Sequence, residues 1–282
     1  MNQIIKRSIV FIVVMTMLLC IRNDVSAATP EGTMYNPVNF GTGRSYTKIW
    51  TRYNDDLNFY ASFTMLQNGY VSINATKPFD DYGEVASYKL YMYDSSGNAV
   101  WDCLTTGQRD IPTSSYNYTV GLKSGIYILR FDPSFVVYSG GISSTISINT
   151  VANPYWEAEN NDSYEKATTL KLKKKYNAVY GENNDMDQDF FRFKVKKGKK
   201  YVISLGNYSD FSATSTIIKI YDPKKKDARK YGSKYSSAGY ELEKKGRVTI
   251  KANKNGYYYI RLYNSFGYSN PGVKYSIKVK QK

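Results

Sequence analysis

The 282-residue chain contains no histidine and only two cysteines, Cys20 and Cys103. The lack of histidine excludes Ser-His-Asp and Cys-His catalysis, and zinc sites that use histidine ligands. Only carboxylate, lysine or tyrosine chemistry would remain for an enzyme. Cys20 lies in an N-terminal apolar run that is predicted below to be cleaved off as a signal peptide. Cys103 would then have no partner for an intramolecular disulfide. We interpret Cys103 as a small buried apolar residue rather than as a reactive thiol.

Long apolar runs are also missing, apart from residues 9–21. This run follows Lys6 and Arg7, is shorter than the roughly 20 residues that cross a bilayer, and precedes a small-x-small motif that ends at Ala27. Cys20 is a poor lipidation site because the bulky Leu19 precedes it. The pattern predicts a signal peptide over residues 1–27 and a secreted, extracellular protein without a membrane anchor.

Helix signals are scarce, whereas tyrosine is common, with 29 residues. Most of the chain consists of short alternating runs that are separated by Gly, Asn, Ser and Pro. This pattern is typical of an all-β sandwich. Residues 28–45, which are rich in Gly, Pro and Asn, predict a flexible leader.

The two halves of the chain resemble one another at a constant offset. Gly125–Phe131 matches Gly256–Leu262, and the same offset pairs Asn58-Phe59-Tyr60 with Asp189-Phe190-Phe191. Two copies are too few for a solenoid, so each copy is expected to be a domain of its own. We expect two tandem β-sandwich domains, over residues 46–152 and 153–282.

Strand alternation assigns faces within the second copy. In Gly256–Asn264, one face carries aliphatic and aromatic side chains that are expected to point inward: Tyr258, Ile260 and Leu262. The other face is expected to be exposed and to bind a ligand through Tyr257, Tyr259, Arg261 and Tyr263. The inward sets of two further strands are Phe191, Phe193, Val195 and Tyr275, Ile277, Val279.

Oxygen side chains gather at two places in the second copy. The first cluster is Glu157, Glu159, Asn161 and Asp162, and the second is Asp185, Asp187 and Asp189. Calcium takes about 6–8 oxygen ligands from carboxylates, amides and carbonyls, a number that two such clusters can supply together. The alternative is a set of solvated loop acids that cap turns, where Asp and Asn are favoured in any case.

The excess of positive charge lies in the second half of the chain. Residues 153–282 hold 28 Lys and Arg against 13 Asp and Glu, a difference of +15, whereas residues 28–152 hold 8 against 10, a difference of −2. The asymmetry suggests an acidic partner or surface. The alternative is that the lysines keep strand edges soluble. No motif for specific nucleic-acid binding accompanies them.

These residues carry a resemblance to a known family. Glu157-Ala-Glu159-Asn-Asn161-Asp162, Asp187-Gln188-Asp189-Phe190-Phe191-Arg192-Phe193 and the tyrosine-rich strand at 256–261 together resemble the bacterial pre-peptidase C-terminal domain family. The sequence is most similar to the collagen-binding domains of clostridial collagenases. The resemblance covers most of the second half, and the first half more weakly through the repeat.

The resemblance implies a jelly-roll-like β-sandwich whose N-terminal linker binds Ca²⁺. The linker ligands of the family fall on Glu157, Glu159, Asn161 and Asp162, and its loop ligands on Asp189 and on Asp185 or Asp187, a choice that stays open. Tyr263 matches a tyrosine with which collagen-binding relatives hold the triple helix. The position of Tyr263 is occupied by Asp132 in the first copy, which also lacks the acidic motif. We therefore expect no metal, or only a weakly bound one, in the first copy.

Three functions fit these features to different degrees. The first is a secreted, monomeric, non-catalytic protein that attaches to an extracellular polymer such as collagen. The second is a cell-envelope protein that binds anionic polymers through its lysine-rich second domain. The third is a carboxylate-based glycoside hydrolase, which needs two carboxyls facing one another across a groove. The tight acidic cluster at a domain entrance suits a cation better, so the protein is not expected to be an enzyme.

Overall fold

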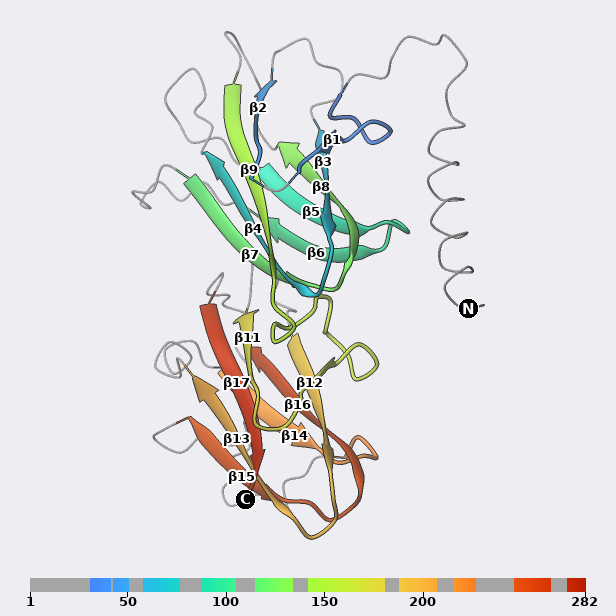
Figure 1. Ribbon diagram of the computed structural model, residues 1–282, viewed down its shortest axis with the longest axis vertical. Coiled ribbons are helices and arrows are strands. Elements are labelled where there is room, and N and C mark those ends of the chain that lie inside the picture. Colours follow the sequence, from blue (N-terminus) through green and yellow to red (C-terminus); the bar gives the residue numbers. More distant parts are fainter. Residues whose placement is uncertain are drawn as a thin grey trace, which may run out of the picture. The chain divides into compact units, whose positions relative to one another are not determined.

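The computed structural model describes residues 31–41, 43–50, 58–76, 88–104, 115–133, 142–180, 188–206, 216–226, 246–264 and 273–282. The chain divides into two compact units, Met1–Glu31 and Gly32–Lys282, and all named strands belong to the second. The described residues form strands, bridges and turns, which confirms the all-β fold class (Figure 1). None of these described ranges forms an apolar helix long enough to cross a membrane.

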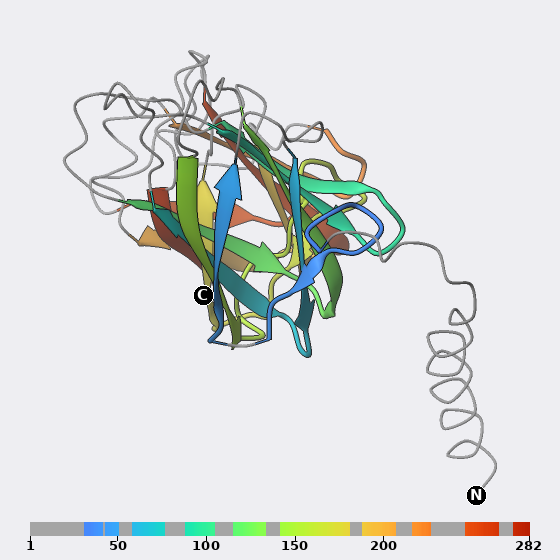
Figure 2. The same ribbon diagram turned by 90° about the horizontal axis from the view of Figure 1, so that it is seen from above.

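The first sandwich consists of two sheets. One sheet has the order β1-β3-β8-β5-β6 and the other has the order β2-β9-β4-β7. Figure 2 shows β2 beside β9 within the second of these sheets. The strands are β1 (Val38–Asn39), β2 (Ser45–Trp50), β3 (Phe59–Met65), β4 (Gly69–Thr76), β5 (Tyr88–Asp94), β6 (Ala99–Leu104), β7 (Ser115–Leu122), β8 (Gly125–Pro133) and β9 (Ile142–Ala152).

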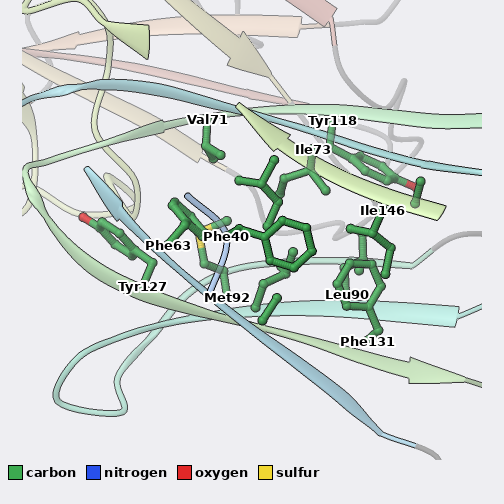
Figure 3. Close-up of a cluster of buried hydrophobic side chains, with 14 of the residues drawn as sticks. Phe40, Phe63, Val71, Ile73, Leu90, Met92, Tyr118, Tyr127, Phe131 and Ile146 are labelled. Carbon is green, nitrogen blue, oxygen red and sulfur yellow. The ribbon is translucent and has the colours of Figure 1, made fainter. Parts of the chain in front are cut away.

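The core of the first sandwich is filled from both sheets (Figure 3). Alternate residues of β3 and β8 point inward, so that Phe63 lies against Tyr127 with ring centroids 5.6 Å apart. Leu90, Ile73 and Phe131 are also fully buried. Burial of a side chain of this kind contributes about 1.5–3 kcal/mol, which makes the period-two pattern the main determinant of strand register.

The second sandwich also has two sheets, with the orders β10-β12-β16-β14 and β11-β17-β13-β15. Its strands are β10 (Thr168–Thr169), β11 (Lys175–Tyr180), β12 (Gln188–Val195), β13 (Lys200–Gly206), β14 (Thr216–Tyr221), β15 (Arg247–Lys251), β16 (Gly256–Asn264) and β17 (Val273–Gln281). The structure confirms the three predicted inward sets, since all of their members are buried: Phe191, Phe193, Val195, Tyr258, Ile260, Leu262, Tyr275, Ile277 and Val279.

The internal repeat is visible in the strand order. Each sandwich has a short strand that pairs in parallel within its sheet: β1 pairs with β3 in the first, and β10 pairs with β12 in the second. The remaining neighbours in the two sandwiches correspond one by one. Among the described strands, β6 has no counterpart in the second sandwich. We propose that the second domain starts at residue 153, directly after β9.

The offset that aligns Gly125 with Gly256 holds for β8 and β16 but is wrong by one position for β3 and β12. The inward positions are 59, 61, 63 and 65 in β3, and 189, 191, 193 and 195 in β12, so Phe59 corresponds to Asp189. Unequal loop lengths change the offset from strand to strand. Phe190 hides the shift in the sequence because it is buried as well, but on the opposite face, against the ring of Tyr164.

The prediction of a flexible leader over residues 28–45 is wrong for residues 31–41 and 43–45, the part of this segment that the structure describes. Val38 and Phe40 are buried in the first core, β1 pairs with β3, and Phe40 donates a backbone hydrogen bond to the carbonyl oxygen of Ser62. The first sandwich therefore begins before residue 46. The Gly- and Asn-rich composition of this segment reflects a tight turn, in which Gly32 donates to the carbonyl oxygen of Asn36.

Candidate functional site

The acidic linker segment, residues 157–162, is held against the second sandwich by backbone hydrogen bonds. Glu157 donates its N–H to the carbonyl oxygen of Asn177 at 3.0 Å, and Asn161 accepts from the N–H of Phe190 at 3.0 Å. These two bonds anchor the segment beside β11 and β12. As a result, side chains that are distant in the sequence meet at the start of β12.

Three carboxylates converge there. Oxygen atoms of Glu157, Glu159 and Asp189 all lie within 4.8 Å of one another. Glu157 and Asp189 are 1% and 0% exposed, respectively, and Asn161 beside them is 0% exposed. Burial of several like charges is unfavourable unless protons or a cation compensate them. This acidic cluster, defined as Glu157, Glu159, Asn161 and Asp189, could therefore hold a metal ion.

Hydrogen bonds orient the members of the acidic cluster. The N–H of Val179 and the amide Nδ2 of Asn161, at 3.2 Å, donate to the two carboxylate oxygens of Glu157. The hydroxyl of Tyr275 donates to Asp189 Oδ2 at 2.6 Å. Asn161 Oδ1, in contrast, is buried without a hydrogen-bond partner. An unpaired buried acceptor is costly, and a cation would satisfy it.

The donor set suits a hard cation. The four side chains offer oxygen atoms, the ligands that Ca²⁺ and Mg²⁺ prefer, and the cluster offers no imidazole or thiolate. Of the seven predicted ligands, four meet in the acidic cluster. Asp162 is exposed and accepts a hydrogen bond from the N–H of Gln188 at 3.4 Å. Asp185 and Asp187 lie outside the described residues.

The outward face of β16 presents the four predicted ligand-binding residues on one side of the sheet. Tyr257 is 38% exposed, and the guanidinium of Arg192 lies 5.1 Å from its ring centroid. The guanidinium of Arg261 lies 4.1 Å from the ring centroid of Tyr263. Cations and aromatic rings thus alternate across the surface, a favourable arrangement that also holds the long side chains in place.

One of the four predicted residues is partly covered. The ring of Tyr164 lies edge-on to Tyr259, with centroids 5.1 Å apart, and also contacts Phe190 and Tyr221. Tyr164 follows the acidic linker segment in sequence, so the same stretch of chain reaches both the cluster and this face. The sequence did not single out Tyr164, because no strand pattern includes it.

A family model matches part of the second half. Residues 187–264 match the model of the bacterial pre-peptidase C-terminal domain. The match confirms the resemblance for this part of the chain, which comprises Asp189, β12 and the whole of β16. The acidic linker residues precede the matched pre-peptidase C-terminal segment.

Several solved structures resemble parts of the chain. The pre-peptidase C-terminal domain of a collagenase from Bacillus anthracis is 14% identical, with 43% of this chain and 98% of that chain covered and a TM-score of 0.31. CorA, a surface-associated copper-binding protein of Methylomicrobium album BG8, is 6% identical, with 43% and 100% covered and a TM-score of 0.31. The periplasmic inhibitor of g-type lysozyme from Aeromonas hydrophila, PliG, is 12% identical, with 41% and 96% covered and a TM-score of 0.27. No curated protein matches the chain.

The first sandwich has an aromatic ring at the position that corresponds to Asp189. Phe59 occupies the position of Asp189, and Gly32 accepts the hydrogen bond from Tyr60 that corresponds to the one between Phe190 and Asn161. Gly32 has φ +88°, and a Cβ atom there would lie 2.8 Å from the ring of Phe59. The ring of Tyr46 stacks on Phe59 at 5.2 Å. The fully buried ring of Phe59 therefore fills the position that the carboxylate of Asp189 occupies in the second sandwich.

The linker that carries the acidic cluster also contacts the first sandwich. Glu159 donates its N–H to the carbonyl oxygen of Gly121 at 2.8 Å, and the ring centroid of Trp156 lies 4.3 Å from that of Tyr70. A Cβ atom on Gly121 would lie 2.4 Å from the carbonyl oxygen of Glu157. Glycine is therefore required for this close approach.

Proposed function

We propose that this protein is a secreted, non-catalytic binding protein that attaches to an extracellular polymer through its second sandwich. In this proposal residues 1–27 are a signal peptide. Calcium at the acidic cluster stabilises the linker and the sheet that carries the binding face. The observation that carries the proposal is the convergence of three carboxylates beside Asn161, whose buried Oδ1 has no hydrogen-bond partner.

Calcium would be held by Glu157, Glu159, Asn161 and Asp189, with Asp162 and either Asp185 or Asp187 as further ligands. The bound ion would offset the charge of the carboxylates and tie residues 157–162 to β12. Removal of the ion would leave like charges buried together, which disfavours the packing of residues 157–162 against the second sandwich. Binding of calcium to the folded state alone stabilises it by mass action.

Collagen is the first candidate for the polymer. The outward side chains Tyr257, Tyr259, Arg261 and Tyr263 lie on one strand that the family model includes. Tyrosine gives a broad apolar contact with a hydroxyl handle at a low cost in side-chain entropy, which suits an extended, proline-rich ligand. Arg261, adjacent to Tyr263, adds hydrogen-bond donors for backbone carbonyl groups of the ligand.

An anionic cell-wall polymer is the second candidate. It is favoured by the cations on the same face, Arg192, Lys219 and Arg261, and by the net charge of +15 for the chain. Binding of this kind depends on released counterions and weakens steeply as salt is raised. Collagen binding through tyrosine contacts should resist salt.

Retention of the full mature protein on fibrillar collagen and on purified cell wall, at low and high salt, separates the two candidates. Salt-resistant retention on collagen that Tyr263→Ala removes would support the first. The matched control is Tyr35→Ala, because Tyr35 is 87% exposed in the first sandwich. Salt-sensitive retention on cell wall that is indifferent to Tyr263→Ala would support the second, and retention on neither polymer contradicts both.

A further inference from the structure

The outer face of the sheet β11-β17-β13-β15 carries charge of one sign. Its four strands, which lie side by side in Figure 1, contain no aspartate and no glutamate. Alternate residues of these strands are buried in the core, so the residues between them point outward. Among the described outward residues there are six exposed cations and no aromatic ring. These six residues are called the basic face: Lys175, Lys200, Arg247, Lys251, Lys278 and Lys280.

The strand register places like charges of the basic face directly opposite one another. Lys175 of β11 is paired with Lys278 of β17, and Lys200 of β13 is paired with Lys251 of β15. Like charges at such positions destabilise a sheet. No acid among the described residues forms an ion pair with any of the six cations. Protection of strand edges does not explain them either, because three of the six lie on the inner strands β13 and β17.

The first sandwich shows that the fold does not need these cations. Its corresponding sheet, β2-β9-β4-β7, contains one lysine and no arginine in its four strands. The offset that aligns Gly125 with Gly256 also aligns Ser147 with Lys278. Ser45 lies opposite Ser147, so a pair of serines takes the place of a pair of lysines. The basic face is therefore a property of the second sandwich alone and is not required by the architecture.

Two features of the basic face limit the class of partner. The cations are distributed over all four strands, so the positive charge extends in two dimensions and not along one line. Five of the six are lysines, which attract hydrated phosphate as point charges, whereas arginine binds it with a fixed geometry. The face offers no aromatic ring on which nucleic-acid bases or sugar rings could stack. A planar array of phosphate groups, as on an anionic lipid bilayer, matches this arrangement.

We propose that the basic face associates with the surface of anionic phospholipid bilayers. Positions that pair across strands or alternate along one strand are about 5–7 Å apart, which is within the Debye length of about 8 Å at physiological salt. The cations therefore act together on the lipid phosphates. The association is peripheral and electrostatic, so it needs no membrane-spanning segment. It goes beyond the polymer-binding face of β16, because it uses the opposite sheet and different residues.

The test measures sedimentation of the full mature protein with phosphatidylcholine vesicles that contain about one-third phosphatidylglycerol, at one fixed calcium concentration. Pure phosphatidylcholine vesicles are the neutral control. The protein should sediment with the anionic vesicles alone, and less of it as salt is raised. The double variant Lys175→Ser with Lys278→Ser installs the serine pair of the first sandwich. It should lower the partition coefficient about 25-fold, at about fivefold for each lysine.

The double variant should keep its fold, with a melting temperature equal to or above that of the wild type, because a repulsive pair is removed. The matched control is Lys224→Ser with Lys226→Ser, which removes the same charge from exposed residues of the turn after β14 in the other sheet. It should change the partition coefficient by less than about twofold. Absence of sedimentation with the anionic vesicles, an equal loss in the control, or tighter binding of soluble heparin or polyglycerol phosphate at equal anion concentration would each overturn the proposal.

Discussion

The substitution Asp189→Asn is expected to reverse its effect on stability according to whether calcium is present. Asparagine has nearly the same shape and still offers an oxygen to the hydroxyl of Tyr275, so the hydrogen bond at 2.6 Å is retained. The main change is the loss of one negative charge from the acidic cluster. Without calcium this loss relieves repulsion, whereas with calcium it removes a negatively charged oxygen from the ligands of the ion.

The distances set the magnitude. Two carboxylates within 4.8 Å of one another repel by about 3.5 kcal/mol or more at an effective dielectric constant of about 20, and Asp189 faces two of them. Proton uptake limits this repulsion, so the variant should exceed the wild type by about 1 kcal/mol or more in chelator. Calcium at about 100 times its dissociation constant should stabilise the wild type by about 2.7 kcal/mol. For a domain of this size that is a rise of about 10 °C in Tm.

Scanning calorimetry of the mature wild type and variant, each in excess EDTA and in excess calcium, measures this difference. The wild type should melt below Asp189→Asn in EDTA and above it in calcium. Asp222→Asn is the matched control, because Asp222 is a buried acid of the same sandwich that pairs with Lys254 at 2.8 Å. The control should be destabilised equally in both solutions.

Two results would refute the reasoning. If Asp189→Asn lowered Tm by the same amount with and without calcium, Asp189 would be a structural acid like Asp222. If calcium left the Tm of the wild type unchanged, the cluster would be neutralised by protons alone. Repeating the titration with magnesium distinguishes a site for calcium from a general site for hard cations.

A glycine, a core ring and a buried acid give three further tests. Gly121→Ala should weaken calcium affinity, because its Cβ displaces the backbone at Glu157, whereas Gly125→Ala, with its nearest contact at 3.6 Å, should not; calcium titration checks both. Phe59→Ala should cost about 3–5 kcal/mol of unfolding free energy in chemical denaturation, independently of calcium. Burial alone would raise the pKa of Asp222. Hydrogen bonds from Lys254 and from the N–H groups of residues 226 and 224 together lower the pKa by more than burial raises it, so the pKa of Asp222 lies below its usual value. The ionised Asp222 therefore stabilises the fold above the unfolded pKa of about 3.9, and this stabilisation is lost as the pH falls through the folded pKa. Asp222→Asn should be about 1–3 kcal/mol less stable than the wild type at neutral pH. This difference between variant and wild type should vanish in acid.

Much of the second sandwich follows from alternation in the sequence. In β16, Tyr258, Ile260 and Leu262 are buried and Tyr257 is exposed, as expected, because one-residue slippage would move the apolar set into solvent. The same rule assigned the inward set of β12, but it did not predict that Phe190 is buried as well. Phe190 lies on the opposite face, where the ring of Tyr164 contacts it.

The acidic cluster could be predicted only in part. Glu157, Glu159 and Asn161 are conspicuous because they are close together in a lysine-rich half, and Asp189 because it opens an apolar strand. Tyr275 and the N–H of Val179, which complete the hydrogen bonding, belong to strands that the sequence does not connect to these acids.

By itself the sequence determined the all-β class, the duplication and the inward face of each strongly alternating strand, because these depend on local periodicity. Only the tertiary structure decided that residues 38–40 belong to the first core, that Phe59 takes the place of Asp189, and that linker and sheet bring three carboxylates together. Those facts depend on the lengths of loops and on backbone hydrogen bonds between distant segments, and neither property is encoded in a local pattern of residues.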